Sequence, residues 1–226
     1  MTQSPPEPGA PGGPVRLPKY QRKTPDQRRR SLMDAAMRCL AERGPERTSI
    51  RSICEEAGVS VGLVNHYYAG KDALIADVYE QLADDLLATL EEQVDSAAEA
   101  GGDLGRRRLT AFIRASFSPV NLDAGLLKVW LAFWTMAQQS ALIAEVHART
   151  YANYRRTLER LIGQLAEEDA YRGLDVRLAA IGLSAVLDGL WLEWCLNPET
   201  FSPDEGVRLC EACLDGLLGP PRALGS

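Results

Sequence analysis

Apolar residues recur every three to four positions along most of the chain, which is the spacing of one buried helix face. Thr24 followed by Pro25 is a helix-start signal, and Gly44 is a stop signal. Between these signals the apolar positions are Leu32, Ala35, Ala36, Cys39 and Leu40. The pattern therefore predicts a helix that begins at Pro25 and ends near Gly44.

The same spacing predicts helices in the rest of the chain. Thr48 or Ser49 is expected to cap a short helix that Gly58 ends, and Ser60 to cap another from Val61 to about Tyr67. Longer helices are expected at about 72–98, 103–117, 122–138, 140–167, 175–197 and 203–218. No stretch alternates with period two for long enough to predict a sheet. The expected fold class is all-α, with about nine helices.

The N-terminal segment differs from the rest of the chain. Residues 1–18 are rich in proline and glycine and lack a periodic apolar pattern, which predicts disorder. Residues 19–23 (KYQRK) then form a basic arm. Arg22, Lys23 and Arg28 are candidates for contact with a DNA backbone or minor groove. A solvated basic tail is the alternative interpretation. The pattern leaves both interpretations open.

Charge is divided unevenly along the chain. Overall, 25 Lys and Arg face 31 Asp and Glu, a net charge of -6. Residues 1–71 contain twelve basic and seven acidic residues, whereas residues 72–226 contain thirteen and twenty-four. A basic beginning joined to an acidic body indicates a nucleic-acid module fused to a different domain. A solvated surface is the alternative for the basic part.

Several protein classes are disfavoured. No uninterrupted apolar run of about 18 residues predicts a membrane span, and no apolar segment near the N-terminus predicts a secretory signal. The five cysteines lie in apolar helical patterns, so we expect reduced core residues and a cytoplasmic protein. Cys210 and Cys213 have metal-ligand spacing but lack a second ligand pair, so no metal and no other cofactor is expected.

Residues 48–68 (TSIRSICEEAGVSVGLVNHYY) form a helix-turn-helix pattern. Gly58 permits the positive φ that ends the first helix, and Val59 fills the angle between the two helices. Ser60 is suited to cap the second helix, which has the size that enters a DNA major groove. The positions expected to hold the unit to the preceding helix are Ile50, Ile53, Ala57, Val59 and Val64. Two short helices around a glycine also occur in proteins that do not bind DNA.

Residues 28–79 resemble the N-terminal domain of the TetR family of bacterial repressors. The resemblance is carried by Ala35-Ala36, Ala41-Glu42-Arg43-Gly44, Thr48-Ser49-Ile50, Ile53, Ala57-Gly58-Val59-Ser60-x-Gly62, His66-Tyr67-Tyr68 and Lys71-x-x-Leu74. It implies a homodimer that binds a near-palindromic DNA operator, with a helical ligand-binding and dimerisation domain behind the DNA-binding domain. The implied boundaries are 24–71 for the DNA-binding domain, 72–218 for the second domain and 219–226 for a tail.

The resemblance also implies which residues meet DNA. Thr48, His66, Tyr67 and Lys71 would meet phosphates, and Ser60, Val61, Gly62, Leu63 and Asn65 would face or flank base edges; Ser49 belongs to the same implied set. Asn65 departs from the family, in which many members have Tyr, and Asn is able to bond an adenine edge through two hydrogen bonds. We expect Tyr67 to lie outside and Tyr68 inside. A packing role is the alternative for His66.

The second domain contains four tryptophans in two pairs, each on one helix face. Trp130 and Trp134 are four residues apart, and Trp191 and Trp194 are three apart. They indicate either core packing or an aromatic pocket suited to a cation. If they line a pocket, the expected pocket residues are Trp130, Phe133, Trp134, Tyr151, Tyr154, Asp188 and Trp191. Asp188 would neutralise a cation there, or would bond a helix end.

Residues 127–134 (LKVWLAFW) and 187–192 (LDGLWL) resemble the C-terminal domain of BetI-like members of the family. This resemblance weakly implies an amine or quaternary-ammonium effector. In this family the last two helices form a four-helix bundle with those of a second subunit. The apolar positions that suit this role are Leu183, Val186, Leu187, Leu190, Leu209, Cys213, Leu214 and Leu217.

Two other functions fit the sequence less well. An enzyme is disfavoured because the two histidines, His66 and His147, have no nucleophile or carboxylate at local spacing, so no catalytic residue is assigned. A helical scaffold that binds proteins without binding DNA is the stronger rival. The sequence as a whole predicts a DNA-binding repressor that a small molecule releases from its operator.

Overall fold

The structure, a computed structural model, describes residues 24–98, 103–168 and 173–218. Within these ranges the chain is all-α, as predicted. The predicted disorder and basic arm of residues 1–23 and the tail at 219–226 lie outside the described residues. The nine helices of the described ranges are α1 (Pro25–Arg47), α2 (Ile50–Ala57), α3 (Val61–Tyr67), α4 (Lys71–Ala98), α5 (Leu104–Ser116), α6 (Ala124–Ala137), α7 (Ala141–Glu168), α8 (Val176–Leu196) and α9 (Pro203–Leu218).

The start of α1 follows the sequence signal. The Thr24 side chain accepts a hydrogen bond from the backbone N–H of Gln27, and the Gln27 side chain accepts one from the N–H of Thr24. Gly44, at φ +73°, breaks the regular helix where the sequence predicted its end. A further turn from Pro45 extends the helical segment to Arg47, because the Pro ring suits the first turn of a helix.

The predicted start of α6 at residue 122 was two residues too early. Asp123 caps α6 by accepting a hydrogen bond from the N–H of Leu126 at 2.8 Å, so the helix begins at Ala124. The preceding turn is held by the Asn121 side chain, which donates to the carbonyl of Ala115 at 2.8 Å. The Leu122 side chain is buried, which explains its apolar signal without a helix.

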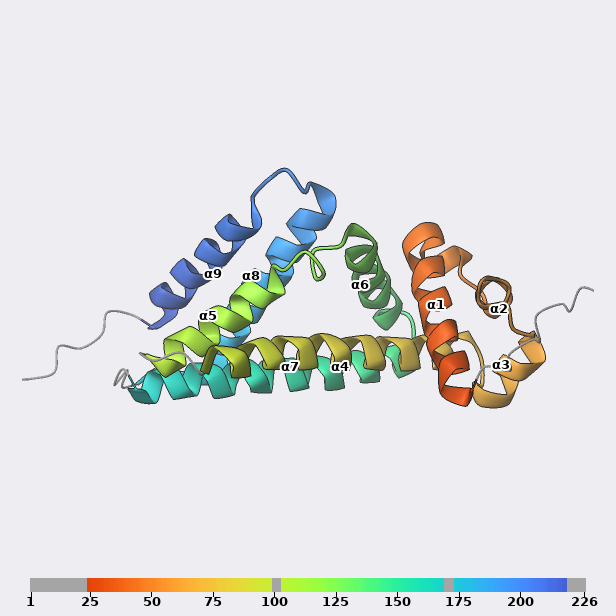
Figure 1. The fold of residues 1–226 in the computed structure, drawn as a ribbon, viewed down its shortest axis with the longest axis horizontal. Coiled ribbons are helices and arrows are strands. Elements are labelled where there is room, and N and C mark those ends of the chain that lie inside the picture. The colour runs from red at the N-terminus through yellow and green to blue at the C-terminus, as the bar shows by residue number, and fades with distance from the viewer. Residues whose placement is uncertain (1–23, 99–102, 169–172, 219–226) are drawn as a thin grey trace, which may run out of the picture.

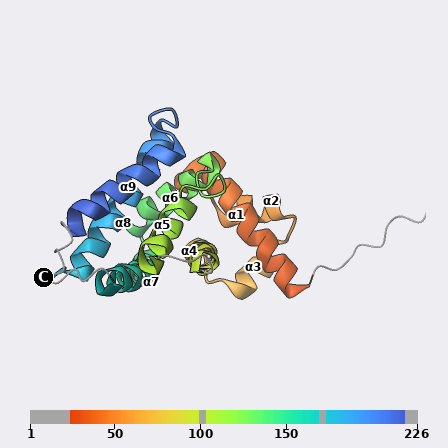
Figure 2. The ribbon, with the colours of Figure 1, turned by 60° about the vertical axis from the view of Figure 1, so that its left-hand side comes forward.

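Two long helices organise the molecule (Figure 1). α4 and α7 lie side by side and run in the same direction, with Glu80 paired to Arg149 and Glu91 paired to Arg160. At one end of this pair lie α1, α2 and α3, and at the other end lie α5, α8 and α9 (Figure 2). α6 packs between α1 and α7, so it lies between the two ends of the molecule.

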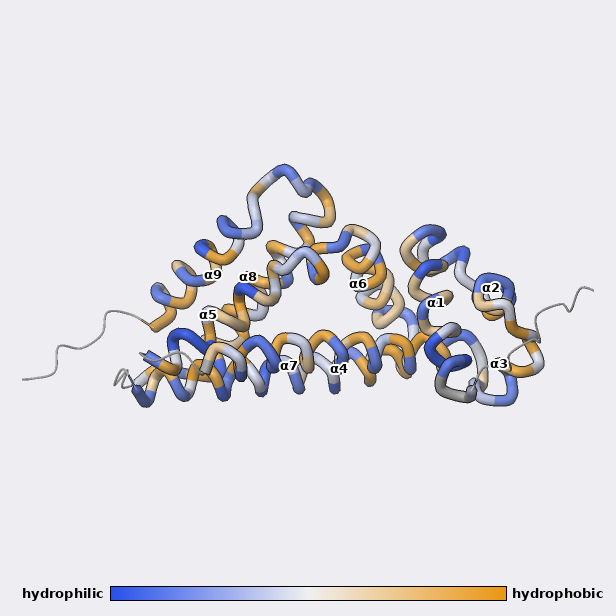
Figure 3. Tube along the Cα trace, viewed as in Figure 1, coloured by the Kyte–Doolittle hydropathy of each residue, from blue (hydrophilic) through white to orange (hydrophobic). Residues whose placement is uncertain are grey.

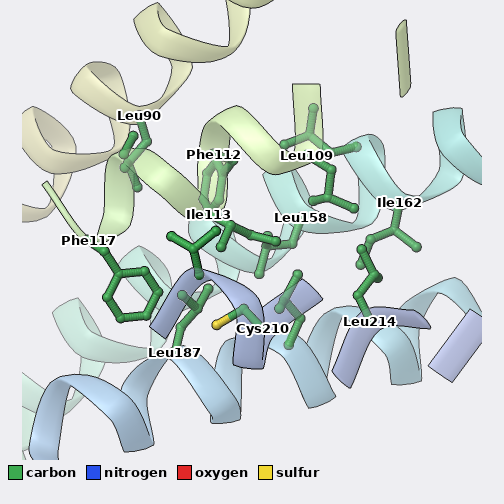
Figure 4. Close-up of a cluster of buried hydrophobic side chains, with 14 of the residues drawn as sticks. Leu90, Leu109, Phe112, Ile113, Phe117, Leu158, Ile162, Leu187, Cys210 and Leu214 are labelled. Atoms are coloured by element: carbon green, nitrogen blue, oxygen red, sulfur yellow. The ribbon is translucent and has the colours of Figure 1, made fainter. Parts of the chain in front are cut away.

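The buried apolar side chains form two clusters. The body cluster joins α4, α5, α7, α8 and α9, with Phe112, Leu158, Leu187 and Cys210 among its members (Figure 4). The second cluster joins the buried side chains of α1, α2 and α3 to those of α4, α6 and α7. Because of this second cluster, the helix-turn-helix shares one continuous core with helices of the body.

Among the described helices, α8 alone is long and apolar enough to cross a membrane. One face of α8 packs in the body core through Ala180, Leu183, Leu187 and Trp191. Its exposed side is also apolar, along a stripe at helical spacing that consists of Leu178, Ile181, Ala185, Gly189, Leu192 and Leu196. The apolar composition of α8 is therefore divided between a core face and an exposed face, and hydrophobic residues occur along both α8 and α9 (Figure 3).

Candidate DNA interface and ligand cavity

The turn between α2 and α3 has the geometry that the sequence predicted. The Ser49 side chain caps α2 by accepting a hydrogen bond from the N–H of Ser52 at 3.1 Å. Gly58 ends α2 in the left-handed region at φ +67°, ψ +36°, where other residues are strained. Ser60 caps α3 by accepting from the N–H of Leu63 at 3.3 Å. These caps fix the direction of α3 relative to α2.

α3 has one buried position and a largely exposed surface. Val64 is buried against the helix-turn-helix core, and Leu63 is half-buried. The exposed positions are Ser60, Val61, Gly62, Asn65, His66 and Tyr67. The sequence predicted that these positions, together with Leu63, would face outward. Apart from half-buried Leu63, all of them are exposed in the structure.

Tyr67 and Tyr68 are divided as expected. The Tyr67 side chain is 62% exposed, whereas Tyr68 is half-buried and its hydroxyl donates to Oδ2 of Asp77 at 2.6 Å. Arg29 of α1 donates to the same carboxylate, at 3.1 Å from its Nε. Burial and the Asp77 hydrogen bond raise the pKa of Tyr68 to about 12, so the hydroxyl keeps its proton. Through these bonds the end of α3 is tied to α1 and α4.

Two residues expected at DNA phosphates have their side chains engaged inside the domain. Thr48 is 3% exposed, and its hydroxyl donates to the carbonyl of Gly44 at 2.8 Å. The Lys71 ammonium donates to the carbonyl of Pro45 at 3.2 Å. Both bonds stabilise the turn between α1 and α2. A phosphate contact by the Thr48 side chain would require its buried hydroxyl to leave this bond.

A small cavity lies in the body between α4, α6, α7 and α8. It is lined by Ala83, Asp84, Leu86, Leu87, Trp130, Trp134, Thr150, Tyr151, Asn153, Tyr154, Asp188 and Trp191. Its volume is about 40 Å³. Since a water molecule needs about 10–15 Å³ by this measure, the cavity has room for about three waters or a small ligand group.

Asp188 is one of two carboxylates that line this cavity, the other being Asp84, and its side chain is partly buried. It accepts a hydrogen bond from the Tyr151 hydroxyl at 3.3 Å, and it forms no ion pair with any residue in the described ranges. Burial raises the pKa of Asp188 to about 6, while Tyr151 and the positive charge of Arg155 oppose the rise. A partly buried carboxylate that forms no ion pair within these ranges is unfavourable, so the site favours an incoming positive charge.

Six of the seven expected pocket residues line this cavity, and Phe133 lies outside it. Phe133 is fully buried and stacks on Tyr79, with ring centroids 4.3 Å apart and an interplanar angle of 6°. It is three residues from Trp130 on α6, so the periodic pattern did not separate the two roles. The fourth tryptophan, Trp194, lies outside the cavity, and its indole N–H donates to the carbonyl of Leu122 at 3.2 Å.

The sequence analysis missed the α4 wall of the cavity and two polar residues on α7. Ala83, Leu86 and Leu87 follow the spacing of one helix face, so a periodic signal existed but did not distinguish a cavity wall from core. Thr150 and Asn153 had no signal, because a polar residue on a helix is usually solvated. The partner of His147 was also missed, since Tyr79 lies 68 positions away in the sequence.

The sequence pattern assigned apolar residues of the last two helices, α8 and α9, to contact with a second subunit. The structure corrects this assignment in part. Leu183, Leu187 and Leu214 are buried in the core of their own chain, so they are not available to a partner. Leu209 and Leu217 of α9 are exposed, at 50% and 40%. The exposed stripe of α8, which begins at Leu178, was not separated from its buried face by the sequence pattern.

Two family models match the sequence. The model described as "Bacterial regulatory proteins, tetR family" matches residues 32–78, which span the helix-turn-helix. The model described as "BetI-type transcriptional repressor, C-terminal" matches residues 105–219, which make up most of the body. The first match includes the beginning of α4, and the rest of that helix, which forms one wall of the cavity, lies between the two matches.

Relatives match over most of the chain. The HTH-type transcriptional regulator BetI of Burkholderia thailandensis is 32% identical over 193 residues, which are 85% of this chain and 94% of that protein. A transcriptional regulator from Pseudomonas aeruginosa PAO1 is 47% identical, with a TM-score of 0.81 over 89% of this chain and 95% of that one. A regulator from Saccharomonospora viridis in complex with choline shares the fold, with 21% identity and a TM-score of 0.68 over 84% and 96% of the chains.

Proposed function

This chain belongs to the TetR family of bacterial transcriptional regulators, with a BetI-type C-terminal domain, and on that premise we propose its mode of action. It acts in the cytoplasm as a homodimeric repressor on a near-palindromic operator. A small cationic effector enters the body cavity and releases the dimer from DNA. The observation that carries this proposal is Asp188, a partly buried carboxylate in an aromatic cavity that has no ion-pair partner among the residues the structure describes.

DNA contact is assigned to the exposed side of α3 and the residue that caps it. Asn65, with Ser60, Val61, Gly62 and Leu63, faces or flanks base edges, and His66 and Tyr67 meet phosphates. Thr48 and Lys71 support the turn that holds these residues, because their side chains are already bonded to carbonyl groups. Ser49 contributes as the cap of α2, whose N-terminus faces the same turn.

Selection of DNA fragments by the purified full-length chain tests this part. We expect an enriched near-palindrome with half-sites about 34–36 Å apart, or a multiple of that spacing. Asn65→Ala should lower the affinity for that site by about tenfold to a hundredfold, since one bidentate base contact is worth about 1–3 kcal/mol. Gln139→Ala, exposed at the turn before α7, is the matched control and should bind as the wild type does. Enrichment of no sequence contradicts the assignment.

The homodimer is assigned to the exposed apolar side of α8 and α9. The α8 stripe of Leu178, Ile181 and Leu192 lies beside Leu209 and Leu217 of α9, and the two helices pack against each other. An exposed apolar patch of this kind marks a protein-protein interface. Two copies related by a twofold axis would form a four-helix bundle.

Sedimentation of Ile181→Asp tests the interface. We expect the wild type to sediment as a dimer and the variant as a monomer, because the buried charge would have no partner. Leu142→Asp, which changes an exposed leucine at the start of α7, should leave the dimer intact. A monomeric wild type would contradict the proposal.

The cationic effector is supported by the composition of the cavity wall. Trp130, Trp134 and Trp191 supply aromatic faces beside the Asp188 carboxylate, and such faces attract quaternary ammonium groups. The structurally similar regulator from Saccharomonospora viridis was solved in complex with choline. Choline is a small cation of this kind, and the walls of the cavity, whose volume is about 40 Å³, must widen to admit it.

The link from cavity to DNA follows from Trp130. This residue lines the cavity, and its ring also contacts Tyr79 and Phe133 at centroid distances of 5.7 and 5.8 Å. Tyr79 and Phe133 belong to the cluster that contains the helix-turn-helix core. A ligand that widens the cavity therefore repacks the core on which α1 rests, and its differential affinity for the two packings sets the shift in operator binding.

Operator binding measured with and without choline tests this switch. We expect choline to weaken operator binding by wild type, and Asp188→Asn to lower choline affinity at least tenfold while operator binding without choline is kept. Choline binding should also weaken as the pH falls through about 6, where Asp188 takes up a proton. Choline binding with unchanged operator affinity would contradict the switch.

A further inference from the structure

A groove that is separate from the ligand cavity lies between α1 and α4. Its volume is about 400 Å³, and its lining includes Met33 and Met37 of α1 and Leu82 of α4. The groove and the cavity have no lining residue in common, although α4 contributes to both. By the same measure the groove is about ten times as large as the cavity, so it has room for several side chains.

The groove combines apolar side chains with unpaired carboxylates. Met33, Met37 and Leu82 are half-buried, and they pack against the second cluster, which contains the core of the helix-turn-helix. Asp34 of α1 and Asp85 of α4 also line the groove, and neither forms an ion pair with any residue in the described ranges. A surface of this composition is complementary to a segment that is both apolar and basic.

Two arginines of α1 line the groove as well. Arg29 is paired with Asp77. Arg30 is exposed and has no acidic partner among the residues that the structure describes. Since α4 contains one basic and eight acidic residues, the groove nevertheless lies against a negatively charged helix. The Arg30 guanidinium suits a segment that brings an aromatic ring, because guanidinium groups stack on such rings.

Residues 15–23 (VRLPKYQRK) have the complementary composition. This segment lies outside the described residues, and it contains four basic and no acidic residues, with Leu17 and Tyr20 among its apolar side chains. It joins the structure at Thr24, the cap of α1, so it is tethered to the helix that forms one side of the groove. Pro18 disfavours a helical conformation for the residue before it and therefore favours an extended course.

The segment is long enough to turn back at Thr24 and reach the groove. Along α1, Met33 lies nine residues and Met37 thirteen residues beyond Thr24, which are about 14 and 20 Å at the rise of an α-helix. An extended chain spans at most about 3.3–3.6 Å per residue, so Tyr20 reaches about 14 Å from Thr24 and Leu17 about 24 Å. Tyr20 therefore reaches no farther than Met33, and Leu17 reaches Met37 even after the turn shortens the span.

We propose that this N-terminal segment folds back antiparallel to α1 and occupies the groove. Leu17 lies beside Met37, and Tyr20 lies between Arg30 and Met33. The flanking basic residues neutralise the two unpaired carboxylates of the groove. The tether favours this contact over a free partner of the same composition, because it raises the effective concentration of the segment at the groove.

The docked segment joins the DNA-binding domain to the body. α1 packs mainly against α2 and α6, so a segment in the groove adds a contact between α1 and α4. It also keeps the basic arm beside α1, which is a third role for the arm besides DNA contact and a solvated tail. The inference goes beyond the proposed function, since neither the operator nor the effector takes part in the contact.

Methyl signals of methionine report on this contact in the full-length chain. Labelling with [methyl-13C]methionine places probes at Met33 and Met37 in the groove and at Met136, which is buried in the second cluster and serves as the reference. Met33→Leu and Met37→Leu assign the two groove signals. In the wild type we expect nuclear Overhauser contacts from the Met33 methyl to the Tyr20 ring and from the Met37 methyl to the Leu17 methyls.

Loss of the apolar anchors should release the segment. Leu17→Asp combined with Tyr20→Asp should abolish these contacts and move both groove signals, while the reference signal stays in place. Gln3→Asp combined with Ser4→Asp adds the same charge outside residues 15–23 and is the matched control, which should leave the groove signals unchanged. The substituted residues precede α1, so the buried cores are untouched.

Charge reversal tests the electrostatic part of the contact. Arg16→Glu combined with Lys19→Glu places like charge beside Asp34 and Asp85, so it should move the groove signals in the same direction as the loss of the anchors does. Groove signals that do not move in this variant would contradict the charged contacts that the proposal requires.

The remaining outcomes identify other occupants of the groove or another place for the arm. Absence of the wild-type contacts, with groove signals that do not respond to the anchor substitutions, overturns the proposal. Groove signals that move only with protein concentration would place a second copy of the chain there and would also overturn it. If the charge reversal lowers affinity for the DNA fragment that the purified chain selects but does not move the groove signals, the arm contacts DNA and the proposal is wrong.

Discussion

The hydroxyl of Tyr79 on α4 lies 2.7 Å from Nδ1 of His147 on α7. Tyr79 is fully buried, and its ring is stacked on Phe133 of α6, so one residue joins three helices. The centroids of the His147 and Tyr151 rings are 4.3 Å apart, and Tyr151 lines the cavity. The pair is therefore placed between the ligand cavity and the core that supports the helix-turn-helix.

Tyr79→Phe should lower the free energy of unfolding by about 1–2 kcal/mol, because it leaves the His147 nitrogen without a partner and keeps the stacked ring. Urea denaturation measures the effect. His147→Ala removes the other partner and also leaves space, so its own cost should be larger. In the double variant the two costs should not add, and the shortfall should be about 1 kcal/mol. Strict additivity would mean that the hydrogen bond does not contribute to stability.

The Asp77 carboxylate should contribute to stability in a pH-dependent way. Burial alone would raise the pKa of Asp77, but hydrogen bonds from Arg29 and Tyr68 hold it below its ordinary value. The native state therefore favours the ionised form. This contribution is fully present above the unfolded pKa of about 3.9 and is lost as the pH falls through the lower folded pKa.

Asp77→Asn should therefore lower the free energy of unfolding at pH 7 by roughly 1 kcal/mol, a modest value because Arg29 is half exposed. The difference in free energy of unfolding between the variant and the wild type should become smaller as the pH falls below about 4. Urea denaturation at a series of pH values measures the gap. Glu92→Gln, on an exposed site of the same helix, should show no comparable gap at either pH.

Asp188 should have the opposite pH dependence. Its folded pKa, about 6, lies above the unfolded value, so the native state binds the extra proton. The stability that this proton confers is present at pH 4 and is lost as the pH rises through about 6. Asp188→Asn removes the buried charge and lets Tyr151 donate to the new amide oxygen. The variant should be more stable than wild type by roughly 1–3 kcal/mol at pH 7.5 and no more stable at pH 4.

Denaturation of Asp188→Asn at both pH values measures the effect, with Glu145→Gln as an exposed control on α7. A destabilised Asn variant at pH 7.5 would mean that the carboxylate has a compensating cationic partner in the apo protein. That result would weaken the argument for a cationic effector. The stability test is therefore also a test of the site that needs no ligand.

Most helix boundaries could be predicted because they depend on neighbouring residues, as the caps at Thr24, Ser49 and Ser60 show. Roles that depend on distant contacts could not. Phe133 and Trp130 carry the same apolar signal, and both contact Tyr79 in the second cluster, but only Trp130 also lines the cavity, which distant parts of the chain form. Thr48 appeared available to a phosphate because its buried bond to Gly44 depends on how the chain turns between α1 and α2.

Substitution by alanine should change the stability of the protein in opposite directions at two helical glycines. A Cβ atom on Gly105 would lie 2.8 Å from Cα of Leu165, where α5 crosses α7, so Gly105→Ala should cost about 1–3 kcal/mol through overpacking. Gly163 on α7 has open space around the same position. Gly163→Ala should stabilise the protein by about 0.5–1 kcal/mol, since alanine has the higher helix propensity. Thermal denaturation of the pair separates crowding from propensity, and equal effects would contradict the close approach of α5 and α7.

Gly62 offers the sharpest separation of folding from DNA binding. It lies exposed in the first turn of α3, and a Cβ atom there would meet nothing within 4 Å. Gly62→Ala should therefore fold normally and be more stable by up to about 1 kcal/mol. In the complex, the added methyl group would stand between the start of α3 and the base edges that the helix approaches.

We expect Gly62→Ala to weaken operator binding at least tenfold, although its unfolding midpoint does not fall. Gly163→Ala makes the same substitution in the body and should leave operator affinity unchanged, so the pair controls for a general effect of added helix stability. Fluorescence anisotropy with a labelled operator measures both. Unchanged affinity in Gly62→Ala would show that this turn of α3 does not approach the DNA closely, and would move the base contacts toward Asn65 and the end of the helix.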